Sequence, residues 1–282
     1  MTQTEVVVAP PEQVGSKQPK PEQGFLNLSV EERCVIAWLA TLALIHTLIY
    51  VFLVPPWQHY DEPGHFLYAA YIVRGGVTAP DDVVIAREVA DSMYRHNFWP
   101  PGVRPDLLSP RPPGIPTDQR HHPPLYYSVI ATLIGPFRYM SVEYQLYLGR
   151  IFSAFLMMLT VIAVWRIGLT ITPDEPQMAL VLAALVAGTP AFVDLMSALN
   201  SDVLMNFAAT TAFLGFAILI RNGWCGSGVL LAVLGTGVAL LTKRTAAPLL
   251  IPLLLALLWS VYRRPLRWWV YLVGGSLGTT TL

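Results

Sequence analysis

Long apolar runs separated by short polar breaks dominate the second half of the chain. The runs cover residues 148–171, 178–193, 203–220, 229–241, 246–261 and 268–282. A helix of about 20 apolar residues crosses a hydrocarbon core roughly 30 Å thick, so these runs predict membrane-spanning helices. The run at 229–241 is short by itself and reaches that length only when 226–242 is counted.

An earlier apolar run at 34–54 also has spanning length, and Pro55 ends it because proline cannot continue a helix. The polar residues ahead of this run are rich in Pro, Gln, Glu and Lys, which predicts disorder. We therefore expect a disordered cytoplasmic tail at 1–31 and a transmembrane domain at 32–282. Because the last run is still apolar at Leu282, this domain is expected to be incomplete at its C-terminus.

Residues 55–146 form a long predicted loop outside the membrane. Apolar residues recur at helical spacing in 64–73, and 82–98 has one apolar and one charged face. Both patterns predict amphipathic helices on the membrane surface. The apolar segment 125–137 is too short for a full span and is typical of an interfacial or re-entrant piece. If it crossed the membrane, every later span would be inverted.

The composition agrees with this architecture. Apolar residues make up 54% of the chain and charged residues 13%, with 18 Lys and Arg against 18 Asp and Glu. Soluble domains carry about 25% charged residues, so a soluble or disordered protein is excluded, and zero net charge argues against a nucleic-acid binder. Cys34 and Cys225 give no disulfide framework and share one predicted face. The predicted fold class is all-α, a polytopic transmembrane helical bundle.

Basic residues of the short loops share one side of this bundle. They are Arg166, Arg221, Arg263, Arg264 and Arg267. The excess of Lys and Arg in cytoplasmic loops places this side and the N-terminus inside, with the long loop outside. Lys243 and Arg244 fall on the outer side against this rule. Basic residues there suit an anionic ligand, or they reach outward to lipid headgroups.

The first candidate for chemistry directly follows the first span. Asp61, Glu62 and His65 lie close together at the predicted bilayer surface. A carboxylate at such an edge can act as a base, so Asp61 and Glu62 are candidate catalytic residues and His65 a candidate substrate-binding residue. The alternative is a helix N-terminus with Asp61 as its cap and Pro63 at an early helical position.

A second candidate lies where the long loop returns to the membrane. Arg120, His121 and His122 precede a Pro-Pro-Leu-Tyr-Tyr segment. Such groups can hold a phosphate, and His121 and His122 can ligate a divalent metal, the one cofactor that the residues leave open. The alternative is an interfacial anchor in which Arg and Tyr lie at headgroup depth.

Two further charged residues lie on or near the same side. Asp202 falls between two later spans, where it either binds substrate or caps the next helix. Arg150 lies about one turn inside an apolar run, and a charge at that depth needs a partner or a cavity. The expected partner is an outer-side carboxylate, Asp61, Glu62 or Asp202. His46, inside the first span, is expected to be a hydrogen-bonded packing residue.

The order of these motifs resembles the C-type glycosyltransferases, membrane enzymes that use polyprenyl-phosphate sugars. Asp61-Glu62, then 123–125 (Pro-Pro-Leu), then 200–202 (Asn-Ser-Asp) match an acidic pair opening a large outer loop, a Pro-Pro-Leu motif and a later Asp. The pattern of 55–66, Pro-Pro-x-x-x-x-Asp-Glu-Pro-x-His-Phe, is closest to an uncharacterised bacterial membrane family. That family is related to the protein O-mannosyltransferases and the aminoarabinose transferase of lipid A.

The resemblance implies a multi-pass enzyme of the bacterial inner membrane that moves a sugar from a polyprenyl-phosphate donor to an acceptor hydroxyl on the outer face, with inversion. It implies that Asp61 is the base and that Asp202 is the second acidic residue. His121 and His122 replace an acid-Lys pair that relatives often have. Arg150, Lys243 and Arg244 are therefore better candidates for neutralising the leaving phosphate.

Two other functions fit parts of the pattern. Arg150 and the prolines that interrupt later runs suit a multi-pass transporter or lipid flippase, in which polar groups gather near the midplane of the bilayer. The short length and the open C-terminus suit a non-catalytic subunit of a membrane assembly. The clustering of ionisable residues at one face favours the enzyme.

Overall fold

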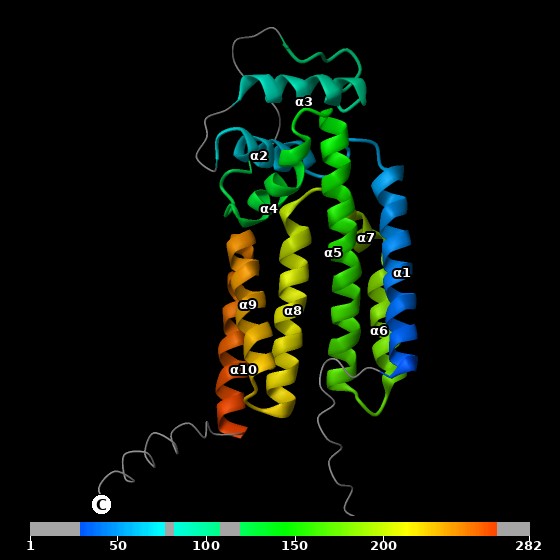
Figure 1. Ribbon diagram of the computed structural model, residues 1–282, viewed down its shortest axis with the longest axis vertical. Coiled ribbons are helices and arrows are strands. Elements are labelled where there is room, and N and C mark those ends of the chain that lie inside the picture. Colours follow the sequence, from blue (N-terminus) through cyan, green and yellow to red (C-terminus); the bar gives the residue numbers. More distant parts are fainter. Residues whose placement is uncertain (1–28, 77–81, 108–118, 264–282) are drawn as a thin grey trace, which may run out of the picture.

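The computed structural model describes residues 29–76, 82–107 and 119–263, and these residues form helices joined by short connections (Figure 1). The α-helices are α1 Val30–Leu53, α2 Glu62–Gly75, α3 Val83–Arg95, α4 Leu125–Ile134, α5 Val142–Ile171, α6 Pro176–Gly188, α7 Pro190–Ser197, α8 Ser201–Asn222, α9 Gly226–Thr242 and α10 Leu250–Arg263. Two short 3-10 helices, η1 Gly135–Phe137 and η2 Arg244–Leu249, follow α4 and precede α10. The predicted all-α class is confirmed.

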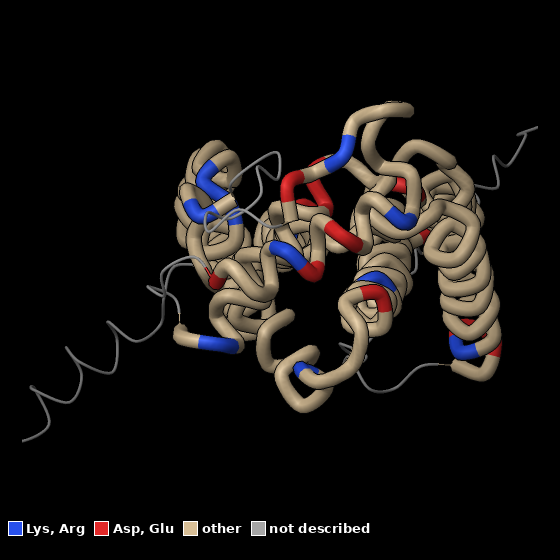
Figure 2. Tube along the Cα trace, turned by 90° about the horizontal axis from the view of Figure 1, so that it is seen from above, with Lys and Arg blue, Asp and Glu red and all other residues tan. Residues whose placement is uncertain are grey.

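The long helices run along one axis and alternate in direction. Helix α1 leads towards one end of the bundle, where α2, α3 and α4 gather and where α5 begins (Figure 1). This end, which also holds the α7–α8 and α9–α10 connections, is called the loop end here. The other end holds the start of α1 and the turns at 172–175 and 223–225, and is called the opposite end. Figure 2, seen from above, shows acidic and basic positions along the helices of the loop end.

Among the described residues, four helices are long and apolar enough to cross a membrane: α1, α5, α8 and η2 with α10. Helices α6 and α7 meet the same criterion only as a pair, bent by 62°, which is the geometry of a broken span or of a re-entrant loop. Helix α9 is apolar but shorter. The predicted spans therefore correspond to helices within the described residues, and the run at 268–282 and most of the tail lie outside them.

The bend between α6 and α7 departs from the single straight span expected at 178–193. Pro190 begins α7 and has no N–H to give to a carbonyl four residues earlier, so the helix breaks. Near this break the Ala187 carbonyl oxygen is 2.8 Å from Nδ1 of His46. The expectation that His46 is a hydrogen-bonded packing residue is confirmed.

Helix α4 remains at the loop end and does not cross the bundle, as expected for 125–137 (Figure 1). Helix α3 is amphipathic as predicted, with Ile85, Val89 and Met93 buried and Glu88 exposed. Helix α2 differs, because Glu62 and the nine residues after it are all buried. It is packed between neighbouring helices and has no solvent-facing stripe over this stretch.

Glycines bring α8 and α9 unusually close. A Cβ added at Gly215 would lie 2.3 Å from the backbone nitrogen of Ala232, and one added at Gly235 would lie 2.5 Å from that of Ala212. Only small residues permit such an approach between membrane helices. This packing holds the start of α8 beside the end of α9 at the loop end, where both helices carry charged residues.

Candidate active site

A cavity of about 290 Å³ opens at the loop end between four chain segments. The segments are the α1–α2 connection, the residues before α4, the α7–α8 connection and the end of α9. The lining residues are Tyr60, Asp61, His65, Gln119, His121, His122, Leu195, Asn200, Asp202 and Lys243. Six residues predicted as site residues from distant parts of the sequence therefore meet in one pocket.

The carboxylate of Asp61 lines the pocket without a bonding partner among the described residues. Asp61 precedes α2 with φ +56°, in the left-handed region that Asp tolerates better than most residues. The alternative of a helix start is confirmed in that Asp61 occupies the N-cap position of α2 and Pro63 lies in its first turn, but the Asp61 side chain makes no capping hydrogen bond. Within the described residues the carboxylate has no hydrogen-bond donor and no ion-pair partner. It is thus placed to accept a proton from a molecule in the pocket.

Glu62, the next residue, is fully buried and does not line the pocket. Its carboxylate accepts hydrogen bonds from the backbone N–H groups of Trp57 and Leu199, both at 3.1 Å. It also accepts hydrogen bonds from Nε and Nη2 of Arg150 at 2.8 and 2.6 Å. Every lone-pair direction of this carboxylate is engaged, which leaves no position for a substrate proton.

Arg150 is equally buried, and its partner among the expected carboxylates is Glu62. Its Nη1 donates to the carbonyl oxygens of Val51 and Val54 at 3.0 and 2.7 Å, and Nη2 donates to Pro55 at 3.0 Å. A buried ion pair is tolerated when hydrogen bonds satisfy the remaining donors and acceptors. Arg150 therefore ties the end of α1 to the start of α2, and its guanidinium does not line the pocket.

Asp202 and Lys243 form an ion pair across the pocket, with Nζ 2.7 Å from Oδ1. Asp202 is in the first turn of α8, but the cap of this helix is Asn200, whose side chain accepts from the Val203 N–H at 3.2 Å. The interpretation of Asp202 as the cap is therefore wrong. Arg244 is exposed next to Lys243 and does not line the cavity.

The buried histidine of the pocket is held in its neutral form. Nδ1 of His65 is 2.9 Å from the Tyr127 hydroxyl, and the two rings stack. Burial lowers the pKa of His65 to about 3, and the positive charge of Lys243 adds to the shift. His65 therefore orients Tyr127 or a bound molecule as a neutral hydrogen-bonding group.

His121 and His122 lie at the pocket rim with ring centroids 4.0 Å apart. Burial and the neighbouring His121 lower the pKa of His122, so it too is mainly neutral at pH 7. Its Nδ1 has no hydrogen-bond partner within the described residues. In that part of the chain no group of three or more His, Cys, Asp and Glu could hold a metal ion. The two histidines line the pocket as an adjacent pair of imidazole rings.

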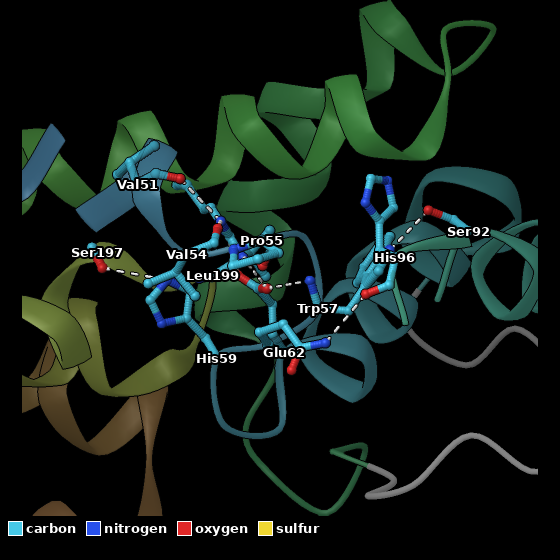
Figure 3. Close-up of polar contacts among 12 residues, drawn as sticks. Val51, Val54, Pro55, Trp57, His59, Glu62, Ser92, His96, Ser197 and Leu199 are labelled. Atoms are coloured by element: carbon cyan, nitrogen blue, oxygen red, sulfur yellow. Dashed lines mark hydrogen bonds and ion pairs between the residues drawn. The ribbon is translucent and has the colours of Figure 1, made fainter. Parts of the chain in front are cut away.

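Three polar lining residues were not predicted as binding groups: Tyr60, Gln119 and Asn200. Tyr60 and Gln119 are adjacent to a predicted motif and Asn200 belongs to one, and these positions are the signal in the sequence that could have found them. Asp194, near Asp202 in the chain, lies elsewhere: its Oδ1 is 3.3 Å from Nδ1 of His59. His59 also contacts the Ser197 hydroxyl at 3.4 Å, which connects the α1–α2 segment to α7 (Figure 3).

Comparison with known proteins gives one family. No curated protein and no solved structure matches the chain. A sequence model of the family described as dolichyl-phosphate-mannose-protein mannosyltransferase matches residues 121–279, which is more than half of the chain. The match includes Asp202 and Lys243 but begins after Asp61. Together with the four to five candidate spans, it shows an integral membrane protein of glycosyltransferase type, and the chain belongs to the dolichyl-phosphate-mannose-protein mannosyltransferase family.

Proposed function

We propose that the protein transfers a sugar from a polyprenyl-phosphate donor to an acceptor hydroxyl in the loop-end pocket, with Asp61 as general base. The observation that carries this proposal is the open carboxylate of Asp61 in the same cavity as the Lys243 ammonium. The transfer reaction needs a base for the acceptor and a positive charge for the leaving phosphate.

The reaction is a single displacement in this proposal. The acceptor hydroxyl gives its proton to an oxygen of Asp61 while its own oxygen attacks the anomeric carbon. The bond between that carbon and the phosphate oxygen breaks, and both its electrons leave with polyprenyl phosphate. One displacement from the face opposite the phosphate inverts the anomeric configuration. The proton then leaves Asp61 to water.

Lys243 is the residue that faces the leaving phosphate in this arrangement. Oδ1 of Asp202 lies 2.7 Å from this ammonium and limits the positive charge of the pocket. A phosphate entering the pocket would compete with Asp202 for the same N–H donors. His65, His121 and His122, with Asn200 and Gln119, supply hydrogen bonds that suit the hydroxyl groups of a sugar.

The positions of the polar groups support this function over transport. A transporter site is expected near the midplane of the bilayer. Here His46 in the middle of α1 bonds the Ala187 carbonyl, and Arg150 is saturated by Glu62 and the end of α1. Neither residue lines the loop-end pocket. Asp61 and Lys243, the two charged groups of this proposal, line that pocket at one end of the bundle.

The decisive experiment replaces Asp61 by Asn in the full chain. Membranes carrying the protein are incubated with radiolabelled polyprenyl-phosphate mannose, and label is followed from lipid phosphate to an acid-stable product. Loss of a general base lowers rates by about 100- to 10,000-fold, so transfer by Asp61→Asn is expected to fall within that range.

Asp174→Asn is the matched control, because it removes the same charge from an exposed turn at the opposite end. It is expected to retain wild-type transfer. Thermal unfolding of both variants shows that they are folded. A folded Asp61→Asn protein that transfers at the wild-type rate would overturn the assignment of the base.

A further inference from the structure

A second cavity, of about 530 Å³, lies at the opposite end of the bundle, far from the proposed active site along the helices. It is a groove between the last turns of α5, α8 and α10. Its lining residues are Ile167, Thr170, Ile171, Phe213, Phe216, Ala217, Ile220, Arg221, Trp259 and Arg263. All three helices are candidate membrane spans, so the apolar part of the groove faces the hydrocarbon core.

The apolar wall of this groove is large and uncovered. Phe213, Ile220 and Trp259 are 49%, 50% and 44% exposed in the described structure. The long axes of α5 and α8 are side by side, and α10 packs on α8 from the other side (Figure 1). A membrane lipid chain is the apolar molecule that is always available at this depth.

Two arginines close the groove where the helices end. Nη1 of Arg221 donates to the carbonyl oxygens of Thr170 and Ile171 at 2.6 and 3.3 Å, and Nη1 of Arg263 donates to the Arg221 carbonyl at 3.5 Å. These bonds use one nitrogen of each guanidinium. The other nitrogens have no hydrogen-bond partner in residues 29–76, 82–107 and 119–263.

Neither arginine is neutralised within those residues. Asp174 and Glu175 lie at the same end, in the turn after α5, but form no ion pair with Arg221 or Arg263. Two guanidiniums with free donors at the end of an apolar groove are complementary to a molecule with an anionic head and an apolar chain. Capping of α5 accounts for the position of Arg221 but not for the pairing of two cations at one groove.

We propose that this groove binds an anionic phospholipid. One acyl chain packs against Phe213, Phe216 and Trp259, and the phosphate is held by Arg221 and Arg263. The site is on the other face of the membrane from the proposed active site. The bound phospholipid belongs to the leaflet at the opposite end of the bundle, where it anchors the protein. It takes no part in sugar transfer.

The test measures which lipid lies in the groove. The full chain, with the photoreactive residue benzoyl-phenylalanine in place of Phe213, is placed in nanodiscs of equal phosphatidylglycerol and phosphatidylcholine. After irradiation, the lipid adducts are identified by mass spectrometry. Adducts of phosphatidylglycerol are expected to predominate. Each of Arg221→Gln and Arg263→Gln is expected to lower this preference about fivefold, the effect of one basic residue on an anionic headgroup.

Two controls separate a specific site from general contact with lipid. The photoreactive residue at Ile45, an exposed position on α1, should label the two lipids about equally. Arg33→Gln removes a charge from the same end but from α1, and should leave the preference at Phe213 unchanged. Equal labelling of both lipids at Phe213, or cross-links into residues 264–282 in place of lipid adducts, would overturn the proposal.

Discussion

Asp61 and Glu62 are neighbours with the same functional group, yet they lie in two regions of opposite character. Asp61 faces an open pocket and has no partner among the described residues, whereas Glu62 is fully buried and accepts four hydrogen bonds. The buried region connects the end of α1, the start of α2, α5 and the α7–α8 segment. The pocket shares the α1–α2 and α7–α8 segments with this region and is completed by the residues before α4 and by the end of α9. Glu62 therefore holds the framework together, whereas Asp61 keeps its carboxylate accessible from the pocket.

The largest expected effect comes from breaking the buried region. Glu62→Ala leaves Arg150 buried without its counter-charge, and removing one partner of such a pair costs about 3–5 kcal/mol of unfolding free energy. Chemical unfolding in mild detergent measures the loss. The double variant Glu62→Leu with Arg150→Met removes both charges and should recover much of it, since an apolar replacement of a buried pair is often neutral. A Glu62→Ala protein as stable as the wild type would contradict the structural role of this pair.

Substitutions in the pocket should change KM for the donor and hardly change the free energy of unfolding. Lys243→Met removes the positive charge that we propose faces the phosphate and is expected to raise KM for the donor by roughly 10- to 100-fold, the effect of a charge-assisted hydrogen bond of about 1.5–3 kcal/mol. Asp202→Asn frees the Lys243 ammonium and is expected to lower the same KM. Steady-state kinetics of both variants shows whether KM for the donor rises or falls. Shifts in the same direction would show that the ion pair, and not the ammonium alone, is what the donor requires.

The order of the spans and the side on which the motifs gather could be predicted from the sequence. Apolar run length and the polar breaks place α1, α5, α8 and α10 within a few residues, and the short length of 125–137 predicts that it does not cross. These features depend on local composition, and membrane insertion responds to local composition directly.

The division of tasks between Asp61 and Glu62 could not be predicted in this way. It depends on Arg150, 88 residues away from Glu62 in sequence, and on which side of α2 each residue faces. Because α2 is packed on all sides over its first ten residues, its periodicity does not distinguish pocket from core. The roles of Asn200 and Asp202 could not be predicted either, since both residue types cap helices. The structure separates them, because Asn200 accepts the Val203 N–H and Asp202 contacts Lys243.

A smaller expected effect is the pH dependence of the unfolding free energy, which His65 in the pocket controls. The native pKa of His65, about 3, is below its ordinary value of 6.5, so the unfolded chain binds this proton more readily. Stability is therefore expected to be full above pH 6.5 and to fall as the pH drops towards 3, by about 2 kcal/mol at pH 5. His65→Gln, which stays neutral, should lack this part of the loss. His96→Gln is the control and should retain it, because His65 is still present. Thermal unfolding at pH 7 and pH 5 provides the comparison.

The smallest expected effect concerns the start of α8, where Asn200 caps the helix and Asp202 lines the pocket. The Asn200 side chain accepts the Val203 N–H, so Asn200→Ala is expected to lower the unfolding free energy by about 1 kcal/mol, the usual cost of a lost N-cap. Asn200→Ser keeps a capping oxygen and should recover most of that stability. Asp202→Ala should cost less, because its carboxylate bonds Lys243 across a partly exposed pocket, where ion pairs contribute about 0–1 kcal/mol. Chemical unfolding of the three variants ranks them. A larger loss for Asp202→Ala than for Asn200→Ala would assign the cap to Asp202 and remove the contrast between a residue that holds the helix and one that serves the pocket.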